Sequence, residues 1–145
     1  DAQWAFCFMW TAIGIIAIAL EVLLTRRAAR KQGIAPMARP ARFAAYSVTP
    51  SVFVAMVLTL KLLMATQVEY VVPVWMMCYG TGVYTAGLFS VRLPRLLGLA
   101  FIAGGALGLL YFERYGLVLA AASFGLLHIL FGIAVIARSR GAGHP

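Results

Sequence analysis

The residue of this chain best suited to chemistry by its type and position is His128. It lies near the middle of a long apolar run at 117–136 and is the only ionisable residue in that run. An ionisable group inside a membrane is costly, so it points to function unless a partner satisfies it. An imidazole can ligate haem or a chlorophyll-type pigment, carry a proton, or hydrogen-bond to a neighbouring helix. All three interpretations stay open, and the hydrogen bond is favoured.

Small residues share the helix face of His128, at Ala121, Gly125 and Gly132. Such a face suits close helix packing or a flat macrocycle lying against the helix. Haem held by two histidines would need a second one inside the membrane, and the other histidine, His144, is in the tail. A pigment with one ligand, or a ligand from a partner subunit, would escape this objection. We therefore expect no cofactor, with haem or a chlorophyll-type pigment on His128 as the alternative.

Four further polar residues within the apolar runs are candidates for a functional role. Glu21 lies near the end of the run at 4–24, and an ion pair with the arginines that follow would account for a carboxylate at this place. A carboxylate that faces inward could instead bind a proton or cation. Thr81, Tyr84 and Thr85 share a helix face in the run at 71–89. They suit hydrogen bonds between packed helices, or else a lined cavity.

Glycine spacing predicts where helices approach one another. Small residues at intervals of four or seven allow close backbone contact, and Gly104 with Gly108 forms a GxxxG motif. The predicted packing positions are Gly80, Gly87, Gly104, Gly108, Gly125 and Gly132.

Motifs of known catalytic or metal sites are absent from the sequence. There is no P-loop, GxSxG, HExxH or Cys/His metal spacing. Ser123 lies five residues before His128, so on an α-helix the two side chains face different directions. We predict no catalytic residue and no metal site, and an enzyme is the less favoured interpretation.

Composition predicts an all-α fold in the membrane. Hydrophobic residues make up 63% of the chain and charged residues 11%, against about 45–50% and about 25% in soluble domains. Pro50 and Pro73 are expected in the first turns of their spans. We predict a single domain, 1–145, that is a polytopic transmembrane helical bundle with a basic loop at 25–42. Its five spans are 4–24, 43–64, 71–89, 96–112 and 117–136.

Charge placement predicts the orientation. Ten of the twelve Lys and Arg residues fall in the first loop, the third loop or the tail, which the positive-inside rule places in the cytoplasm. The C-terminus is then cytoplasmic and Asp1 lies outside, and we expect a further span or a cleaved segment upstream. The net charge of +8 is explained by this topology, so no nucleic-acid partner is expected.

The second half of the chain contains three motifs: Trp75, Tyr79 and Gly80; Phe89, Ser90 and Arg92; and Phe124, Gly125, His128, Ile129, Phe131 and Gly132. Through these motifs it resembles an uncharacterised family of small multi-pass inner-membrane proteins of Gram-negative bacteria. The resemblance covers roughly the last 75 residues well and the first half loosely. It implies a helical membrane fold with an additional N-terminal span and adds weight to His128. It brings no activity and no catalytic residues.

These observations favour a non-catalytic membrane protein of the bacterial inner membrane. It would be a scaffold or accessory subunit whose partners are the lipid bilayer and other membrane subunits, or copies of itself. The alternatives are a cofactor-bearing subunit for electron or energy transfer, and a small proton-linked transporter or sensor that uses Glu21, His128 and the Thr81–Thr85 face.

Overall fold

The computed structural model describes residues 2–31, 39–88, 92–111 and 113–141. Nearly all of these residues are helical and none lies in a strand, which confirms the all-α class. The chain divides into two compact units, Asp1–Arg42 and Phe43–Pro145. Each unit is described by itself.

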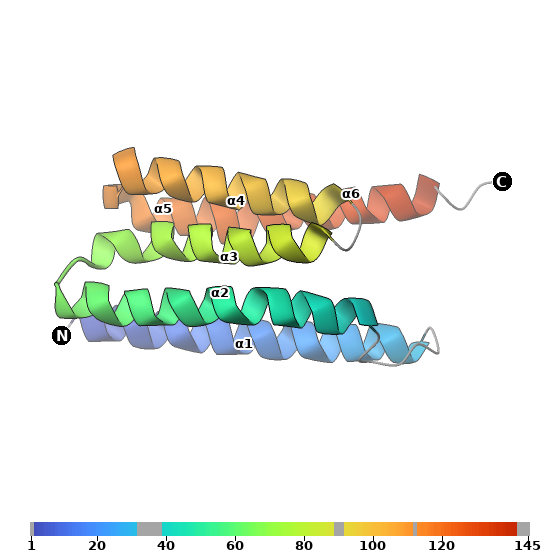
Figure 1. Ribbon diagram of the computed structural model, residues 1–145, viewed down its shortest axis with the longest axis horizontal. Coiled ribbons are helices and arrows are strands. Elements are labelled where there is room, and N and C mark those ends of the chain that lie inside the picture. The colour runs from blue at the N-terminus through green and yellow to red at the C-terminus, as the bar shows by residue number, and fades with distance from the viewer. Residues whose placement is uncertain (1, 32–38, 89–91, 112, 142–145) are drawn as a thin grey trace. The chain divides into compact units, whose positions relative to one another are not determined.

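The first unit consists mainly of α1 (Ala2–Lys31), a helix of 30 residues (Figure 1). The predicted basic loop at 25–42 is shorter than expected, because α1 continues to Lys31 and α2 already begins at Arg39. Alanine, arginine and lysine are good helix formers, and basic residues in a last turn also complement the helix dipole. Within α1 the side chain of Glu21 lies outside the described part of the structure.

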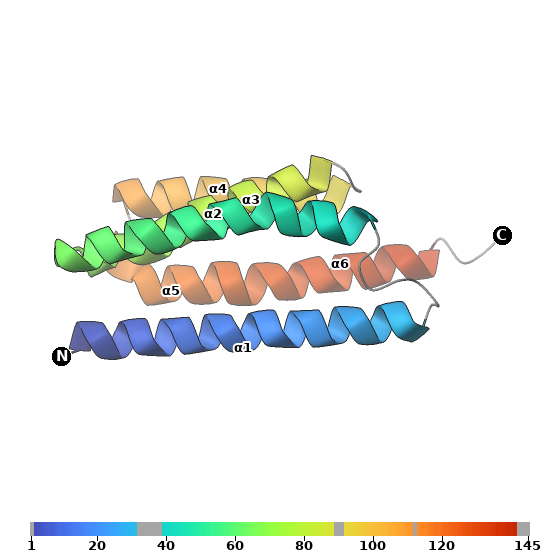
Figure 2. The ribbon, with the colours of Figure 1, turned by 60° about the horizontal axis from the view of Figure 1, so that its bottom comes forward.

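The second unit is a series of helices joined by short turns. Figure 2 shows its last three elements, α5 to α6, as one continuous rod. The helix α2 (Arg39–Met64) begins four residues before this unit and belongs to it from Phe43 onward. The elements that follow are a 3₁₀ turn (Val68–Tyr70), α3 (Val71–Leu88), α4 (Arg92–Tyr111), a 3₁₀ turn (Glu113–Tyr115), α5 (Gly116–Ala120), a π-helical segment η3 (Ala121–Leu127) and α6 (His128–Gly141).

Three helices of the described chain are long and apolar enough to cross a membrane, and this is compatible with a membrane protein. They are Arg42–Met64, Arg92–Tyr111 and Gly116–Arg138. The first and third predicted spans, 4–24 and 71–89, are not among them. For the third span there is a simple reason: α3 has only 18 residues, and glycine, threonine and tyrosine lower its hydropathy.

The two prolines behave differently from one another. Pro73 is the third residue of α3, as expected for a proline in a first turn. Pro50, in contrast, lies inside α2 as its twelfth residue, and it would be the eighth residue even of a helix that began at residue 43. The predicted first-turn position of Pro50 is therefore wrong.

The core of the second unit surrounds α3 and α4. Val71, Val72 and Met76 of α3 and Phe101 of α4 are almost fully buried. The side chains facing away from this core are large and apolar, as on α2, where Phe53, Leu60 and Met64 are more than half exposed. Helices with apolar residues on every side are typical of a lipid environment.

Candidate functional site: the Tyr79–His128 cluster

His128 lies where a π-helical segment ends. The segment Ala121–Leu127 forms wider turns than an α-helix, and His128 is the first residue of α6. Single π-helical turns inside longer helices are rare and are frequent at functional sites. The sequence predicted an ordinary α-helix across this region, so the π segment is new information about the surroundings of His128.

A hydrogen bond joins His128 to α3. The hydroxyl oxygen of Tyr79 lies 2.9 Å from Nε2 of His128. Either the tyrosine O–H donates to an unprotonated Nε2, or Nε2–H donates to the tyrosine oxygen, depending on the imidazole tautomer. Tyr79 and His128 are 49 residues apart in sequence and belong to different helices. A hydrogen bond from His128 to a neighbouring helix is the interpretation that the sequence favours.

Two phenylalanine rings complete the cluster. Phe101 of α4 lies edge-on to both Tyr79 and His128, with ring centroids 5.1 and 5.3 Å away. Phe124 of the π segment lies nearly parallel to the imidazole at 6.3 Å and packs edge-on against Phe101 at 5.0 Å. Edge-to-face aromatic pairs add about 0.5–1.5 kcal/mol beyond the area they bury. Three segments, α3, α4 and η3, thus hold the imidazole in one orientation.

The second imidazole nitrogen is buried. Nδ1 of His128 has no hydrogen-bond partner among the described residues. Leaving a buried polar atom unpaired costs about 1–3 kcal/mol, so Nδ1 opposes folding while Nε2 supports it. Tyr79 therefore supplies the one side-chain hydrogen bond of His128 within the described chain.

This geometry bears directly on the cofactor alternative. An axial ligand to haem or a pigment needs a nitrogen lone pair that points into open space. Nε2 faces Tyr79 at hydrogen-bond distance, and Nδ1 is covered by protein. The residues present do not fit a macrocycle on His128 unless the Tyr79 bond is broken.

Ser123 and the hydroxyls of α3 do not form a second reactive site. The buried Ser123 hydroxyl donates to the Leu119 carbonyl oxygen of its own helix at 2.6 Å. Thr81 and Thr85 likewise donate to carbonyl oxygens one turn earlier, at 2.8 Å each. Tyr84 has no hydrogen bond to the rest of the polar face in the described chain. The hydroxyls of Ser123, Thr81 and Thr85 therefore donate within their own helices and not to His128.

The glycines sort into two groups. A Cβ on Gly80 would lie 2.8 Å from the Gly98 carbonyl oxygen, and one on Gly87 would lie 2.8 Å from the Arg95 backbone nitrogen. At Gly125 and Gly132 a Cβ would meet no atom within 4 Å in the described structure. The tight contact is thus between α3 and α4, while the small-residue face around His128 has open space.

The GxxxG motif of α4 has a smaller part in this contact than expected. Cβ atoms on Gly104 and Gly108 would meet only side-chain atoms, of Met76 and Leu119, at 3.0 Å. Gly105, between them, would place its Cβ 2.9 Å from the Pro73 carbonyl oxygen. The close backbone approach follows Gly98 and Gly105, which are spaced by seven residues.

Two further contacts attach α2 to α3 and were not predicted. The indole N–H of Trp75 donates to the Thr59 hydroxyl at 2.8 Å, and that hydroxyl donates to the Ala55 carbonyl oxygen. A Cβ on Gly82 would lie 3.0 Å from Cα of Val48. An indole and a hydroxyl within two neighbouring apolar runs are the sequence signal that could have indicated this pair.

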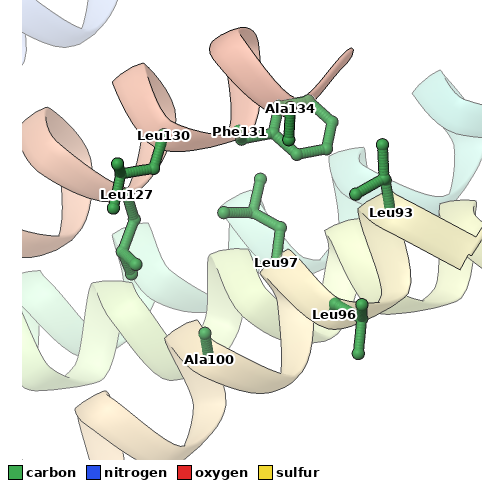
Figure 3. Close-up of a pocket in the computed structure, with 8 residues that line it drawn as sticks. All are labelled: Leu93, Leu96, Leu97, Ala100, Leu127, Leu130, Phe131 and Ala134. Carbon is green, nitrogen blue, oxygen red and sulfur yellow. The ribbon is translucent and has the colours of Figure 1, made fainter. Parts of the chain in front are cut away.

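The described residues contain no group of three or more His, Cys, Asp or Glu that could hold a metal ion. An apolar groove lies between α4 and α6 (Figure 3), and none of its lining residues carries a polar side chain. His128 is not among the residues that line this groove. In the comparisons with known proteins, no family model, curated protein or solved structure matches the chain.

Proposed function

We propose that this chain is a non-catalytic subunit of the bacterial inner membrane that crosses the bilayer five times and associates with other membrane subunits or with itself. The observation that carries the proposal is the state of its polar core. His128 is bonded to Tyr79, and Ser123, Thr81 and Thr85 are bonded to their own helices. Within the described residues, these polar groups take part in structural hydrogen bonds and are not gathered into one reactive site.

Surface composition supports the association part of the proposal. In the spanning segment of α2 only Ala55 is buried and more than half of the side chains are exposed, including Phe53 and Leu60 at 66% and 63%. Lipid can cover such a surface, and so can the helix of another subunit. Extended apolar faces of this kind are where membrane helices meet laterally.

The orientation belongs to the same proposal. With ten of its twelve basic residues in the first loop, the third loop and the tail, the chain follows the positive-inside rule with a cytoplasmic C-terminus. The helix boundaries support this arrangement, because Arg92 begins α4 and Arg138 lies near the end of α6, at the same end of an antiparallel pair.

The test is purification from the native membrane in a mild detergent, followed by an absorption spectrum and mass spectrometry of the accompanying polypeptides. The proposal predicts a colourless protein with a stoichiometric partner or a defined number of its own copies. A Soret or bacteriochlorophyll band that shifts in His128→Ala would overturn it in favour of a cofactor subunit. A colourless monomer without any partner would overturn the association.

One observation favours a second candidate, a proton-linked transporter or sensor. Nδ1 of His128 is buried without a partner inside a π-helical distortion, and polar atoms left in this way are often kept for function. This candidate requires water to reach the imidazole, although the adjacent groove is apolar. Proton flux into vesicles that contain the protein, lost in His128→Gln, would favour it over the structural subunit.

A further inference from the structure

The groove between α4 and α6 has a buried floor and exposed rims. It encloses about 230 Å³. Leu97 in its floor is 8% exposed, whereas Leu96 and Leu130 at its rims are 59% and 51% exposed. Its lining is entirely hydrocarbon or aromatic: Leu93, Leu96, Leu97, Ala100, Leu127, Leu130, Phe131 and Ala134. A ligand for this space must be apolar along its length.

Figure 3 shows the direction of the groove. Leu93 and Ala134 lie toward one end, and Ala100 and Leu127 lie toward the other. Seven residues separate Leu93 from Ala100, so the groove follows α4 for about 10 Å. The shape is a slot parallel to the helices, and this is also the direction of a lipid acyl chain in a bilayer.

Positive charge is found at only one end of the slot. Arg92 directly precedes Leu93, and Arg138 lies one helical turn, about 6 Å, beyond Ala134. Both arginine side chains are exposed. Arg95, in contrast, is partly buried, and its Nε donates to the Gly87 carbonyl oxygen at 2.7 Å. Among the side chains that the structure describes at this end of the slot, Arg92 and Arg138 are therefore the exposed cations that can reach a ligand headgroup.

We propose that this slot, with Arg92 and Arg138 at its mouth, binds an anionic phospholipid. One acyl chain lies between α4 and α6, and the phosphate lies at the two arginines. The inference rests on the membrane location in the proposed function but not on any partner subunit. Anionic lipids of the cytoplasmic leaflet attract basic residues at the surface, and the apolar slot beside the charges adds a site for the chain.

The experiment is native mass spectrometry of the full chain in detergent, with phosphatidylglycerol and phosphatidylcholine of identical acyl chains as competing probes. We expect retention of phosphatidylglycerol to exceed that of phosphatidylcholine by at least tenfold. Arg92→Gln and Arg138→Gln should each reduce this preference about fivefold, since each removes one headgroup contact. Arg114→Gln is the matched control, because Arg114 is also exposed but lies at the opposite end of these helices.

A groove variant tests the chain-binding part separately. Ala134→Phe fills the slot and should lower retention of both lipids, while Ala103→Phe, at an exposed position on α4 outside the slot, should not. Free glycerol phosphate in excess should fail to displace the lipid. Displacement by glycerol phosphate would mean a phosphate site without a chain site and would overturn the proposal.

The lipid proposal would also be overturned by equal retention of the two lipids. It would likewise be overturned if a variant that combines Arg92→Gln and Arg138→Gln kept the preference for phosphatidylglycerol. Failure here is distinguishable from failure of the proposed function. If the chain purifies with its partner but shows no lipid preference, only the lipid site is overturned. If the chain retains phosphatidylglycerol but is a monomer, only the proposed association with other subunits is overturned.

Discussion

Gly80 and Gly98 face one another across the α3–α4 contact, and neither position has room for a side chain. A Cβ on Gly98 would lie 2.7 Å from the Gly80 carbonyl oxygen, and a Cβ on Gly80 would lie 2.8 Å from the Gly98 carbonyl oxygen. This reciprocal contact brings the two backbones together at the level of the neighbouring Tyr79. It therefore helps to set where the hydroxyl that bonds His128 is placed.

We predict that Gly98→Ala destabilises the protein by about 2–4 kcal/mol, because the new methyl group would overlap backbone atoms that cannot move independently. The Tyr84 backbone nitrogen would be only 2.5 Å away. Thermal unfolding in detergent measures the change. Gly132→Ala is the control and should be neutral or stabilising by up to about 1 kcal/mol, since alanine favours helix and open space surrounds that position. Equal melting temperatures for the two variants would contradict the close contact.

Arg95 is predicted to hold the end of α3 rather than to serve as a general surface charge. Its Nε–H donates to the Gly87 carbonyl oxygen, one of the last in α3. Arg95→Ala removes the donor from a carbonyl near the helix end and should lower stability by about 1–2 kcal/mol. The exposed Arg138→Ala should change it by less than about 0.5 kcal/mol. A reversed order of the two effects would contradict this role.

Thr66 offers a stabilising substitution. It ends α2 in the left-handed region, with φ of 59°, and the Gln67 and Thr66 amides donate to the Leu62 and Leu63 carbonyl oxygens. Glycine usually occupies this position in such a helix end, and a β-branched residue is strained there. Thr66→Gly should raise stability by about 0.5–1 kcal/mol in the same unfolding assay. Thr66→Val keeps the strain, so it should give no gain, and a gain from valine would contradict the explanation.

The topology predicts two reporter outcomes in a bacterial host. Green fluorescent protein fused after residue 145 should fluoresce, since the C-terminus is proposed to be cytoplasmic. Alkaline phosphatase fused after Tyr115, in the turn between α4 and α5, should be active, because that turn is proposed to lie outside. Exchanging the two reporters is the control and should silence both. A fluorescent fusion at residue 115 would contradict the orientation.

The helical class and most helix positions could be predicted from the sequence. Long uncharged runs without period-two alternation indicate helices and not strands. The helix α4 covers 96–111 of the run predicted at 96–112, and the helix from Gly116 contains the run predicted at 117–136. Helix ends were less predictable. Arg26 to Lys31 were assigned to a loop on account of their charge, although arginine and lysine extend a helix into the interface without penalty.

The polar pair and the close contact were harder to predict. The cost of an ionisable group in lipid indicates His128, but the π-helical segment that ends beside it has no simple sequence signal. The GxxxG motif predicts close packing at Gly104 and Gly108, whereas the close approach of the backbones uses Gly98 and Gly105 at a spacing of seven. Gly98 and Gly105 share the seven-residue spacing of Gly80 and Gly87 on the facing helix, and this spacing brings the same helix face back every second turn.

The most direct test of a structural role for His128 is a double-mutant cycle on Tyr79→Phe and His128→Leu, with unfolding and partner retention both measured. The account predicts that each single variant loses about 1–2 kcal/mol and that the pair shows a coupling of about 0.5–1.5 kcal/mol. The double variant should still purify with the same partner or number of copies. Zero coupling would contradict the hydrogen bond as a stabilising contact. Single variants with unchanged stability that lose proton flux, or a bound pigment, would show that His128 is a functional residue and contradict the central claim.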